Sequence, residues 1–269
     1  MTTSKTLSVG FAALLTAAAL FGSTRARAQE PAAGPQPQLQ ESLEQAFAEQ
    51  GLRIDLEAGL CSIPVEVCMR DDLLEYLLVA DYGSSHESLF STSVTPSIWN
   101  TALVALGAEP ARGGRFVEKD PLPTEEEFAA GVSPYVVELP EGTPFYFYAL
   151  WQEDDEPRLH RLEDLVGNLR TGRAMQRHAL RYVGSRMARA EPGKDEEVYL
   201  PDMEGNLISV FFFGNDKEIV STALEDSVFD TIWLANKWLV PERGTPVQLI
   251  TSRKPLDGLP AALKELVAQ

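Results

Sequence analysis

Short runs of alternating apolar and polar residues follow one another through most of this chain, and they limit the folds that it can adopt. Residues 52–59 (LRIDLEAG), 59–70 (GLCSIPVEVCMR) and 73–80 (LLEYLLVA) come in direct succession, and alternation with a period of two is typical of strands. Similar runs predict further strands at 144–151, 179–186 and 245–251. Strands joined without long crossovers favour an antiparallel or mixed sheet, so we expect an α+β fold.

Few segments have the pattern of helices. In the clearest one, residues 95–107 (TPSIWNTALVALG), Thr95 stands at the capping position, Pro96 at the first helical position and Gly107 at the end. Shorter signals predict helices at 42–51, 161–169 and 259–269. We therefore expect a few helices packed on a mostly antiparallel or mixed sheet.

A hairpin is predicted in the last third of the chain, at residues 197–213 (EVYLPDMEGNLISVFFF). Two apolar runs flank Glu204, Gly205 and Asn206, and residues of these types suit a tight turn.

The N-terminus has the pattern of an export signal. Lys5 precedes an apolar run at residues 7–21, and the small-x-small sequence at 26–28 predicts cleavage after Ala28. No later apolar run reaches the ~20 residues that a membrane-spanning helix needs. We expect a signal peptide at 1–28, a flexible leader rich in Pro and Gln at 29–41, and a single domain at 42–269, located in the periplasm or outside the cell.

The charge of the chain restricts its partners. It has 40 Asp and Glu against 23 Lys and Arg, a formal net charge of −17 at pH 7. Removal of residues 1–28 takes away three cationic residues and no acidic one. So acidic a chain repels nucleic acid phosphates, which excludes nucleic acid as a partner. The expected partner is an unknown protein or another component of the cell envelope.

Several blocks of the sequence together resemble the YdjY-type domain of exported bacterial proteins. The similarity spans residues 51–251 and rests on these blocks: LRIDLEAG, LEYLLVADYGSSHESLFSTSVTPSIWNTALVALGAEP, GNLRTGRAM, YVGSRM, GNLISVFF and VPERGTPVQLI. The resemblance implies export and one domain, and it implies no particular activity. It draws attention to four polar residues, His86, Glu87, Ser88 and Arg186.

Residues 84–88 (SSHES) form a polar block between a predicted strand and the predicted helix at 95–107. In a structural interpretation, Ser84 and Ser85 close a turn and His86 bonds to the backbone beneath the helix. If the block is extended, Glu87 points away from His86 and does not orient the imidazole. We favour this interpretation, in which the block is a turn that holds two strands together.

A catalytic alternative uses the same residues. In it, His86 acts with Glu87 or Ser88 in a hydrolase-like reaction, and Arg186 holds an anionic group of the substrate. No G-x-S-x-G turn or other nucleophile signature surrounds the serines. Arg186 and Trp99, which lies in the predicted helix, are the candidate binding residues.

We expect no metal site and no cofactor. Zinc hydrolases carry two histidines four residues apart, but Phe90 stands four residues after His86. His160 and His178 are the other histidines, and the two cysteines lack the short spacing of metal ligands.

Cys61 and Cys68 leave two outcomes open. An oxidising compartment favours a disulfide between them. A straight strand would instead hold them ~23 Å apart and on opposite faces. A bridge therefore requires Ile63 and Pro64 to break the strand into a turn.

Two functions remain. The sequence favours a non-catalytic binding or structural protein of the cell envelope, because it has an acidic surface and no complete catalytic motif. The alternative is the hydrolase-like enzyme with His86, Glu87, Ser88 and Arg186.

Overall fold

The computed structural model of the protein describes residues 42, 45–190, 193–264 and 266. The predicted signal peptide, residues 1–28, and the predicted leader, residues 29–41, lie outside the described residues.

Eight strands pair side by side into a closed barrel. In order around the barrel they are β2 (Leu60–Val67), β17 (Val247–Ser252), β7 (Pro144–Glu153), β11 (Leu180–Tyr182), β15 (Val220–Ser221), β14 (Asn206–Ser209), β3 (Tyr76–Ala80) and β4 (Ser88–Thr92). The barrel closes where β2 pairs with β4, through Glu66 with Ser91 and Val67 with Phe90. Neighbouring strands are antiparallel except for β3 with β4 and β14 with β15, which are parallel.

Two more strands extend this sheet beyond the ring. β1 (Arg53–Asp55) pairs with β2, and β8 (Glu156–Arg161) forms a hairpin with β7. The mixed sheet and the small number of helices agree with the sequence prediction. The architecture differs from the α+β fold that we expected, because the sheet closes on itself instead of forming a layer beneath helices.

Strand β7 shows how the barrel is filled. Phe145, Phe147, Ala149 and Trp151 belong to the main apolar core. The residues between them, Tyr146, Tyr148 and Leu150, belong to a second cluster with the C-terminal helix α5 (Ala261–Lys264). Because successive side chains of a strand point to opposite faces, one aromatic strand supplies both clusters.

The predicted helix at 95–107 is confirmed as α2 (Pro96–Ala105), which ends before Gly107. Its first turn is capped from elsewhere in the chain, since the Ser97 N–H donates to the Asp202 carboxylate at 2.8 Å while the Thr95 side chain makes no capping bond. A tertiary contact has replaced the local cap that the sequence suggested.

The predicted hairpin at 197–213 is wrong. Its first part is β13 (Glu197–Tyr199), which pairs with β12 (Met187–Arg189), and its second part is β14, which pairs with β3 and β15. The short helix α4 (Leu200–Glu204) separates the two parts, and Gly205 ends it with a φ of 78°. A Cβ at Gly205 would lie 2.9 Å from the Cα of Gly83, so the glycine serves a close approach of two chain segments.

A small second sheet has the strand order β10 (Arg173–Ala174), β9 (Val166–Asn168) and β16 (Trp233–Ala235). The helix that we predicted at 161–169 is only a single 3-10 turn, η2 (Leu162–Leu165), followed by β9. A further 3-10 turn, η3 (Glu225–Val228), lies before β16.

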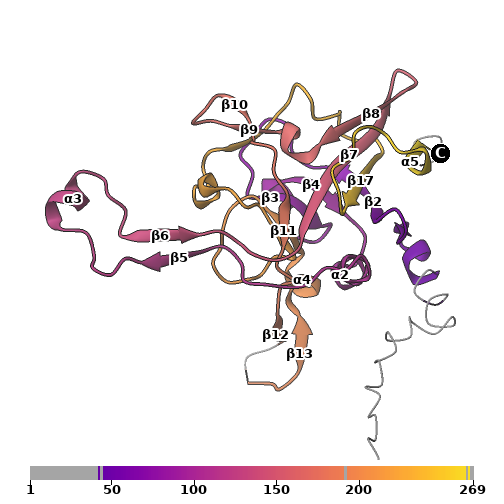
Figure 1. Ribbon diagram of the computed structural model, residues 1–269. Coiled ribbons are helices and arrows are strands. Elements are labelled where there is room, and N and C mark those ends of the chain that lie inside the picture. The colour runs from indigo at the N-terminus through magenta and orange to yellow at the C-terminus, as the bar shows by residue number, and fades with distance from the viewer. Residues whose placement is uncertain (1–41, 43–44, 191–192, 265, 267–269) are drawn as a thin grey trace, which may run out of the picture. The chain divides into compact units, whose positions relative to one another are not determined.

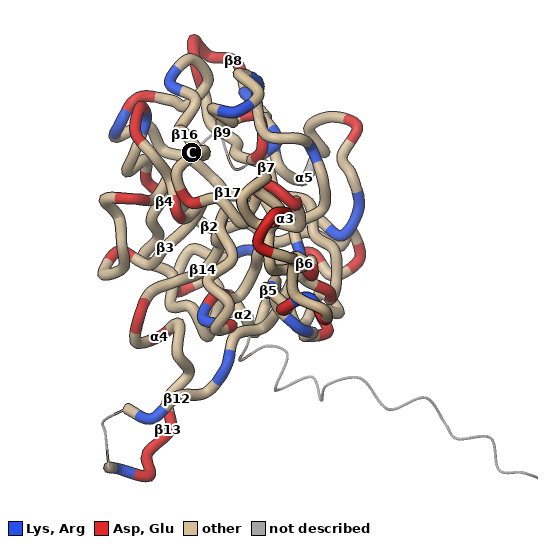
Figure 2. The backbone as a smooth tube through the Cα atoms, turned by 90° about the vertical axis from the view of Figure 1, so that its left-hand side faces the viewer, with Lys and Arg blue, Asp and Glu red and all other residues tan. Residues whose placement is uncertain are grey.

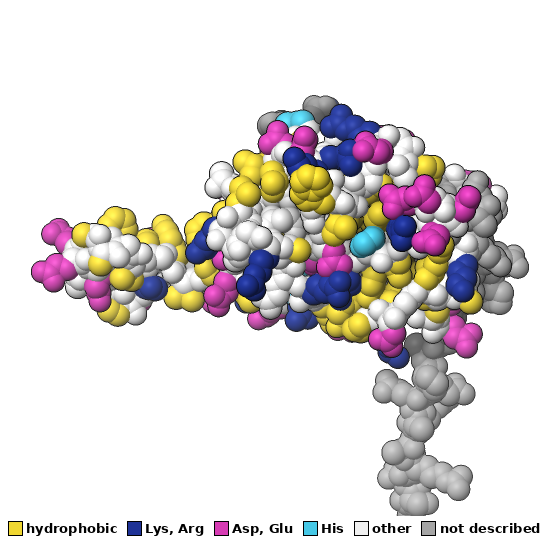
Figure 3. Space-filling model, turned by 90° about the horizontal axis from the view of Figure 1, so that it is seen from above, with side chains coloured by type: hydrophobic (Ala, Val, Ile, Leu, Met, Phe, Trp, Pro, Cys, Tyr) yellow, Lys and Arg dark blue, Asp and Glu magenta, His cyan; other side chains and the backbone are white. Residues whose placement is uncertain are grey.

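Two hairpins project from the barrel (Figure 1). One consists of β5 (Arg115–Glu118), the helix α3 (Glu125–Ala129) and β6 (Tyr135–Glu138); we call residues 115–139 the arm. The other is β12 with β13. Figure 3 shows apolar side chains along the arm and acidic side chains at its tip.

Of the two outcomes left open for Cys61 and Cys68, the structure has the one without a bridge. Strand β2 runs without a break through Ile63 and Pro64, which pair with Leu249 and Gln248 of β17. An unbroken strand keeps the two thiols far apart, and both cysteines are free.

Candidate functional site

The block at 84–88 forms a 3-10 turn, η1 (Ser85–Glu87), between β3 and β4. Ser88 is fully buried, and its hydroxyl donates a hydrogen bond of 2.6 Å to the carbonyl oxygen of Ser84. The His86 side chain is 80% exposed. The block thus forms a turn that Ser88 holds together, and our expectation that His86 is bonded beneath the helix is wrong.

Glu87 also differs from the extended arrangement that we considered. Because the backbone turns here, the Glu87 carboxylate lies 3.2 Å from Nε2 of His86. Glu75 is a neighbour, since its N–H donates to the Glu87 carbonyl oxygen at 2.9 Å. Partial burial, and then repulsion by Glu87, raise the pKa of the Glu75 carboxyl. The turn therefore places an imidazole beside carboxylates, while the hydroxyl of Ser88 is buried.

The structure does not join Arg186 to this turn. Its guanidinium donates to the carbonyl oxygens of Asn215, at 3.0 Å, and Met187, at 3.5 Å. The bond to Asn215 connects the start of the β12–β13 hairpin with the loop before β15. Trp99 is fully buried and packs against Phe147 at a ring distance of 6.3 Å, so a ligand at the surface cannot reach it. Trp99 is a core residue rather than the binding residue that we considered.

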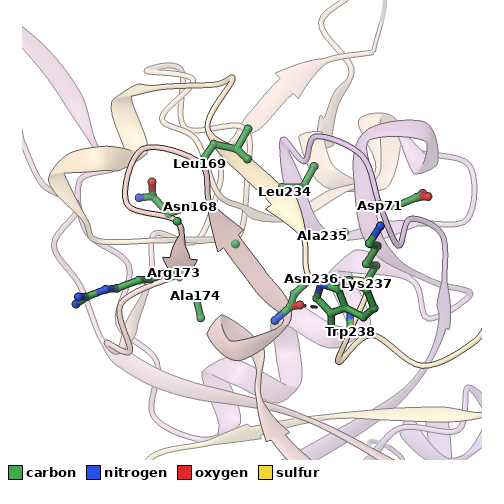
Figure 4. Close-up of a pocket in the computed structure, with 12 residues that line it drawn as sticks. Asp71, Asn168, Leu169, Arg173, Ala174, Leu234, Ala235, Asn236, Lys237 and Trp238 are labelled. Carbon is green, nitrogen blue, oxygen red and sulfur yellow. Dashed lines mark hydrogen bonds between the residues drawn. The ribbon is translucent and has the colours of Figure 1, made fainter.

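The structure has a cavity away from the 84–88 turn. A cleft of about 450 Å³ lies over the small sheet, between the β9–β10 hairpin and the segment that follows β16 (Figure 4). Its lining comes from three parts of the chain, Asp71, residues 167–174 and residues 234–238.

Trp238 forms one side of this cleft, and 84% of its surface is exposed. Lys237 Nζ lies 5.1 Å from the centre of the indole ring, so a cation is held against the ring. The backbone N–H of Trp238 donates to the side-chain oxygen of Asn236 at 3.4 Å, and the Asn236 amide donates to the Asp164 carbonyl oxygen at 3.0 Å. These bonds attach the exposed indole to a fixed loop.

The floor of the cleft is a row of small and apolar residues. Gly167 of β9 stands in register between Leu234 of β16 and Ala174 of β10. A Cβ on Gly167 would meet nothing nearer than the Leu234 carbonyl oxygen at 3.6 Å. The opposite face of the same sheet is buried through Trp233. The missing side chain at Gly167 therefore leaves open space above the sheet.

A second lobe continues on the other side of β10. It has a volume of about 820 Å³ and shares Asn168, Arg173 and Ala174 with the first lobe. Leu224 lines it, and so does Leu139 at the root of the arm. The two cavities thus meet at β10, through the three residues that they share.

The β9–β10 turn at the centre of the cleft is fixed by polar contacts. Asp226 accepts from the Asn168 amide and from Arg170, both at 2.9 Å. The Asn168 side-chain oxygen accepts from the backbone N–H groups of Arg170 and Thr171. Since the cleft is built on these bonds, it exists before a ligand arrives.

The cleft was not predicted from the sequence. One signal was present, a tryptophan that follows a strand within the polar sequence NKW at 236–238. Nothing in the sequence shows that residues 167–174 fold beside it, because about 60 residues separate the two segments.

Neither metal ligands nor a membrane helix are found in the described part of the chain. Among these residues, no three His, Cys, Asp or Glu side chains gather in a group that could hold a metal ion. None of the helices there is both long and apolar enough to cross a membrane.

No family model, curated protein or solved structure matches this chain. The resemblance to the YdjY-type domain thus stays a prediction from the sequence.

Proposed function

We propose that the protein is a non-catalytic binding protein, exported to the cell envelope, and that its ligand occupies the cleft beside Trp238. The observation that carries the proposal is an indole 84% exposed at the side of a preformed cleft. Large apolar side chains are usually withdrawn from water, and contiguous exposed ones mark binding surfaces. Leu169, which also lines the cleft, is 55% exposed.

The cleft chemistry favours an apolar side chain of a polypeptide as the ligand. A sugar needs free hydrogen-bonding side chains around its hydroxyls, but the amides of Asn168 and Asn236 are already bonded within the protein. The floor at Gly167 and Leu234 offers apolar contact instead. Arg173 and Lys237 lie at the rim, where they can reach polar groups that flank an inserted side chain.

The hydrolase alternative has less support. It needs a nucleophile that a substrate can reach, whereas Ser88 is fully buried and its hydroxyl is bonded to Ser84. The His86 and Glu87 side chains lie at the surface, and Arg186 bonds to other partners.

Site-specific photocrosslinking in the native envelope tests the proposal. A photoreactive residue at position 169, on the rim of the cleft, should give an adduct with a polypeptide of one defined mass. The same residue at position 56 is the matched control, because Leu56 is also 55% exposed but lies in the turn between β1 and β2. The control should give no such adduct.

Two substitutions connect the adduct with the cleft. Trp238→Ala removes the exposed ring, and Gly167→Val fills the floor with a side chain whose Cβ would have no neighbour nearer than the Leu234 carbonyl oxygen at 3.6 Å. Each should abolish the adduct while the protein stays folded. An adduct that survives both substitutions would place the ligand elsewhere, and an adduct of lipid or glycan would rule out a polypeptide ligand.

A further inference from the structure

The arm has an apolar surface that nothing in the described part of the chain covers. Strands β5 and β6 pair only with each other among the described residues. No residue of the arm, 115–139, is buried. A two-stranded sheet with water on both faces is at most marginally stable alone. The fold of the arm therefore does not explain why its apolar side chains are exposed.

Both faces of the hairpin carry large apolar side chains. On one face, Phe116 and Tyr135 pack edge to face with ring centres 6.2 Å apart, yet they are 43% and 41% exposed. On the other face, Val136 is 49% exposed beside Val117. At the tip, Leu122 is 58% and Phe128 is 62% exposed.

The other projecting hairpin shows that such exposure is not general in this protein. Among the described residues of β12 and β13, Met187 is the one large apolar side chain that is exposed, at 51%. Arg189 and Glu197 pair at its far end. A hairpin can therefore project from this barrel with fewer large apolar side chains exposed, and the exposed apolar surface of the arm is a property of its own sequence.

The root of the arm is held by ion pairs between its two chain segments and by a close contact with Phe212. Arg112 and Arg115 both pair with Glu138 at 2.8 Å. Gly114 lies against the Phe212 ring, where an added Cβ would be 2.7 Å from ring atoms. These contacts present the apolar surface in a defined direction, as a docking surface requires.

The charges of the arm indicate what covers it. Residues 115–138 contain six carboxylates and two cations, and α3 at the tip is acidic in Figure 2. Among the described residues, the ion pairs of the arm lie at its root, on Glu138. Glu125 and Glu126 are exposed to solvent, and they lie in the same short helix as Phe128.

We propose that the arm is a docking surface for a protein partner that presents apolar side chains alternating with Lys or Arg. Such a partner matches the apolar faces of the hairpin and the carboxylates of its tip at the same time. A second copy of this chain fits less well, because each copy has a net charge of −17 and two acidic arms repel each other. The proposal does not depend on the cleft beside Trp238.

A designed peptide probe tests the proposal with the purified protein. One fluorescent 12-residue peptide alternates Leu with Lys, and a second, of equal length and charge, alternates Ser with Lys. We expect the Leu-Lys peptide to bind at least tenfold more tightly in fluorescence anisotropy, because only that peptide covers the apolar faces. Equal affinities would overturn the proposal, as would no binding of the Leu-Lys peptide.

Variants locate the binding on the arm. Phe116→Ser with Phe128→Ser should weaken the Leu-Lys peptide tenfold or more without lowering the urea midpoint, since both side chains are exposed. Glu125→Gln with Glu126→Gln should weaken it several-fold and flatten its salt dependence. Glu127 is left intact because it closes the capping box of α3 with Thr124.

Matched controls distinguish binding at the arm from binding by negative charge alone and from binding in the cleft. Asp154→Asn with Asp155→Asn removes the same charge from the β7–β8 turn and should leave binding unchanged, and asparagine tolerates the positive φ at both positions. Trp238→Ala should also leave it unchanged. Equal losses from the turn and arm variants would overturn the proposal. So would a dimer in light scattering that Phe128→Ser dissociates, because a second copy would then cover the arm.

Discussion

The Ser88 hydroxyl donates to the Ser84 carbonyl oxygen at 2.6 Å and so closes the turn that carries His86. Ser88→Ala should lower the free energy of unfolding by about 1 kcal/mol. The loss stays at this level because the Ser84 carbonyl keeps a second donor, the N–H of Glu87 at 3.2 Å. Urea unfolding of the wild type and the variant measures the difference.

His86→Ala is the matched substitution in the same turn. The imidazole is 80% exposed and pairs only with Glu87 among the described residues, so we expect a change within about 0.5 kcal/mol. A loss as large as that of Ser88→Ala would show that His86 has a structural role that these contacts do not reveal.

Trp238→Ala should leave stability almost unchanged, within about 0.5 kcal/mol, because its ring is 84% exposed. Trp233, five residues earlier, is fully buried behind the same small sheet. Trp233→Ala should cost about 3–5 kcal/mol. Thermal unfolding of both variants checks the contrast, and a large loss for Trp238→Ala would mean that the indole supports the fold instead of facing a ligand.

A buried ion pair gives a third test. Arg161 donates to the fully buried Glu163 and, at 2.6 Å, to the carbonyl oxygen of His178. Arg161→Met leaves the Glu163 carboxylate without its cation, and we expect a loss of about 3–5 kcal/mol in urea unfolding.

The control for Arg161→Met lies on the same strand. Arg158 forms exposed ion pairs with Glu153 and Glu156. Arg158→Met should cost less than about 1 kcal/mol. Similar losses in the two variants would contradict the difference in burial.

The elements that the sequence predicted well are those specified by their own residues. The alternation at 60–67 and 144–151, and the Pro96 and Gly107 boundaries of α2, are local signals. Closure of the barrel is not local, because it depends on β2 meeting β4 and β17 at once. The predicted hairpin at Gly205 failed for the same reason. A glycine is equally suited to a tight turn and to the end of a short helix. In this fold, tertiary contacts stabilise the short helix, and Gly205 ends it.

The candidate sites, too, could be predicted only where neighbouring residues in the chain form them. The 84–88 turn could be predicted from the sequence because Ser84 and Ser88 are close in the chain, but the sequence does not show which of these side chains is buried. The cleft joins Gly167 to Trp238 through the pairing of β9 with β16. That pairing brings distant segments together, and neither segment alone carries a recognisable motif.

Glu218 makes the stability of the protein depend on pH. The residue is 2% exposed, and burial raises the pKa of its carboxyl from 4.5 to about 7. Asp216 adds to the rise, whereas a backbone hydrogen bond, Lys217 and Ser209 oppose it. Between pH 4.5 and 7 the folded protein therefore binds more protons here than the unfolded chain does. Since the folded state holds the extra proton, raising the pH through this range destabilises it.

Glu218→Gln should remove this contribution, because the amide keeps the shape of the protonated carboxyl and does not ionise. At pH 8 we expect the variant to be more stable than the wild type by roughly 3 kcal/mol, which corresponds to a pKa difference of about 2.5 units. At pH 4 the two proteins should be alike. Burial lowers the pKa of His178, which destabilises the fold on the acid side, so the measured quantity is the difference between the two urea midpoints at each pH. A difference that does not grow from pH 4.5 to 7 would show that Glu218 is not buried as a proton-binding group.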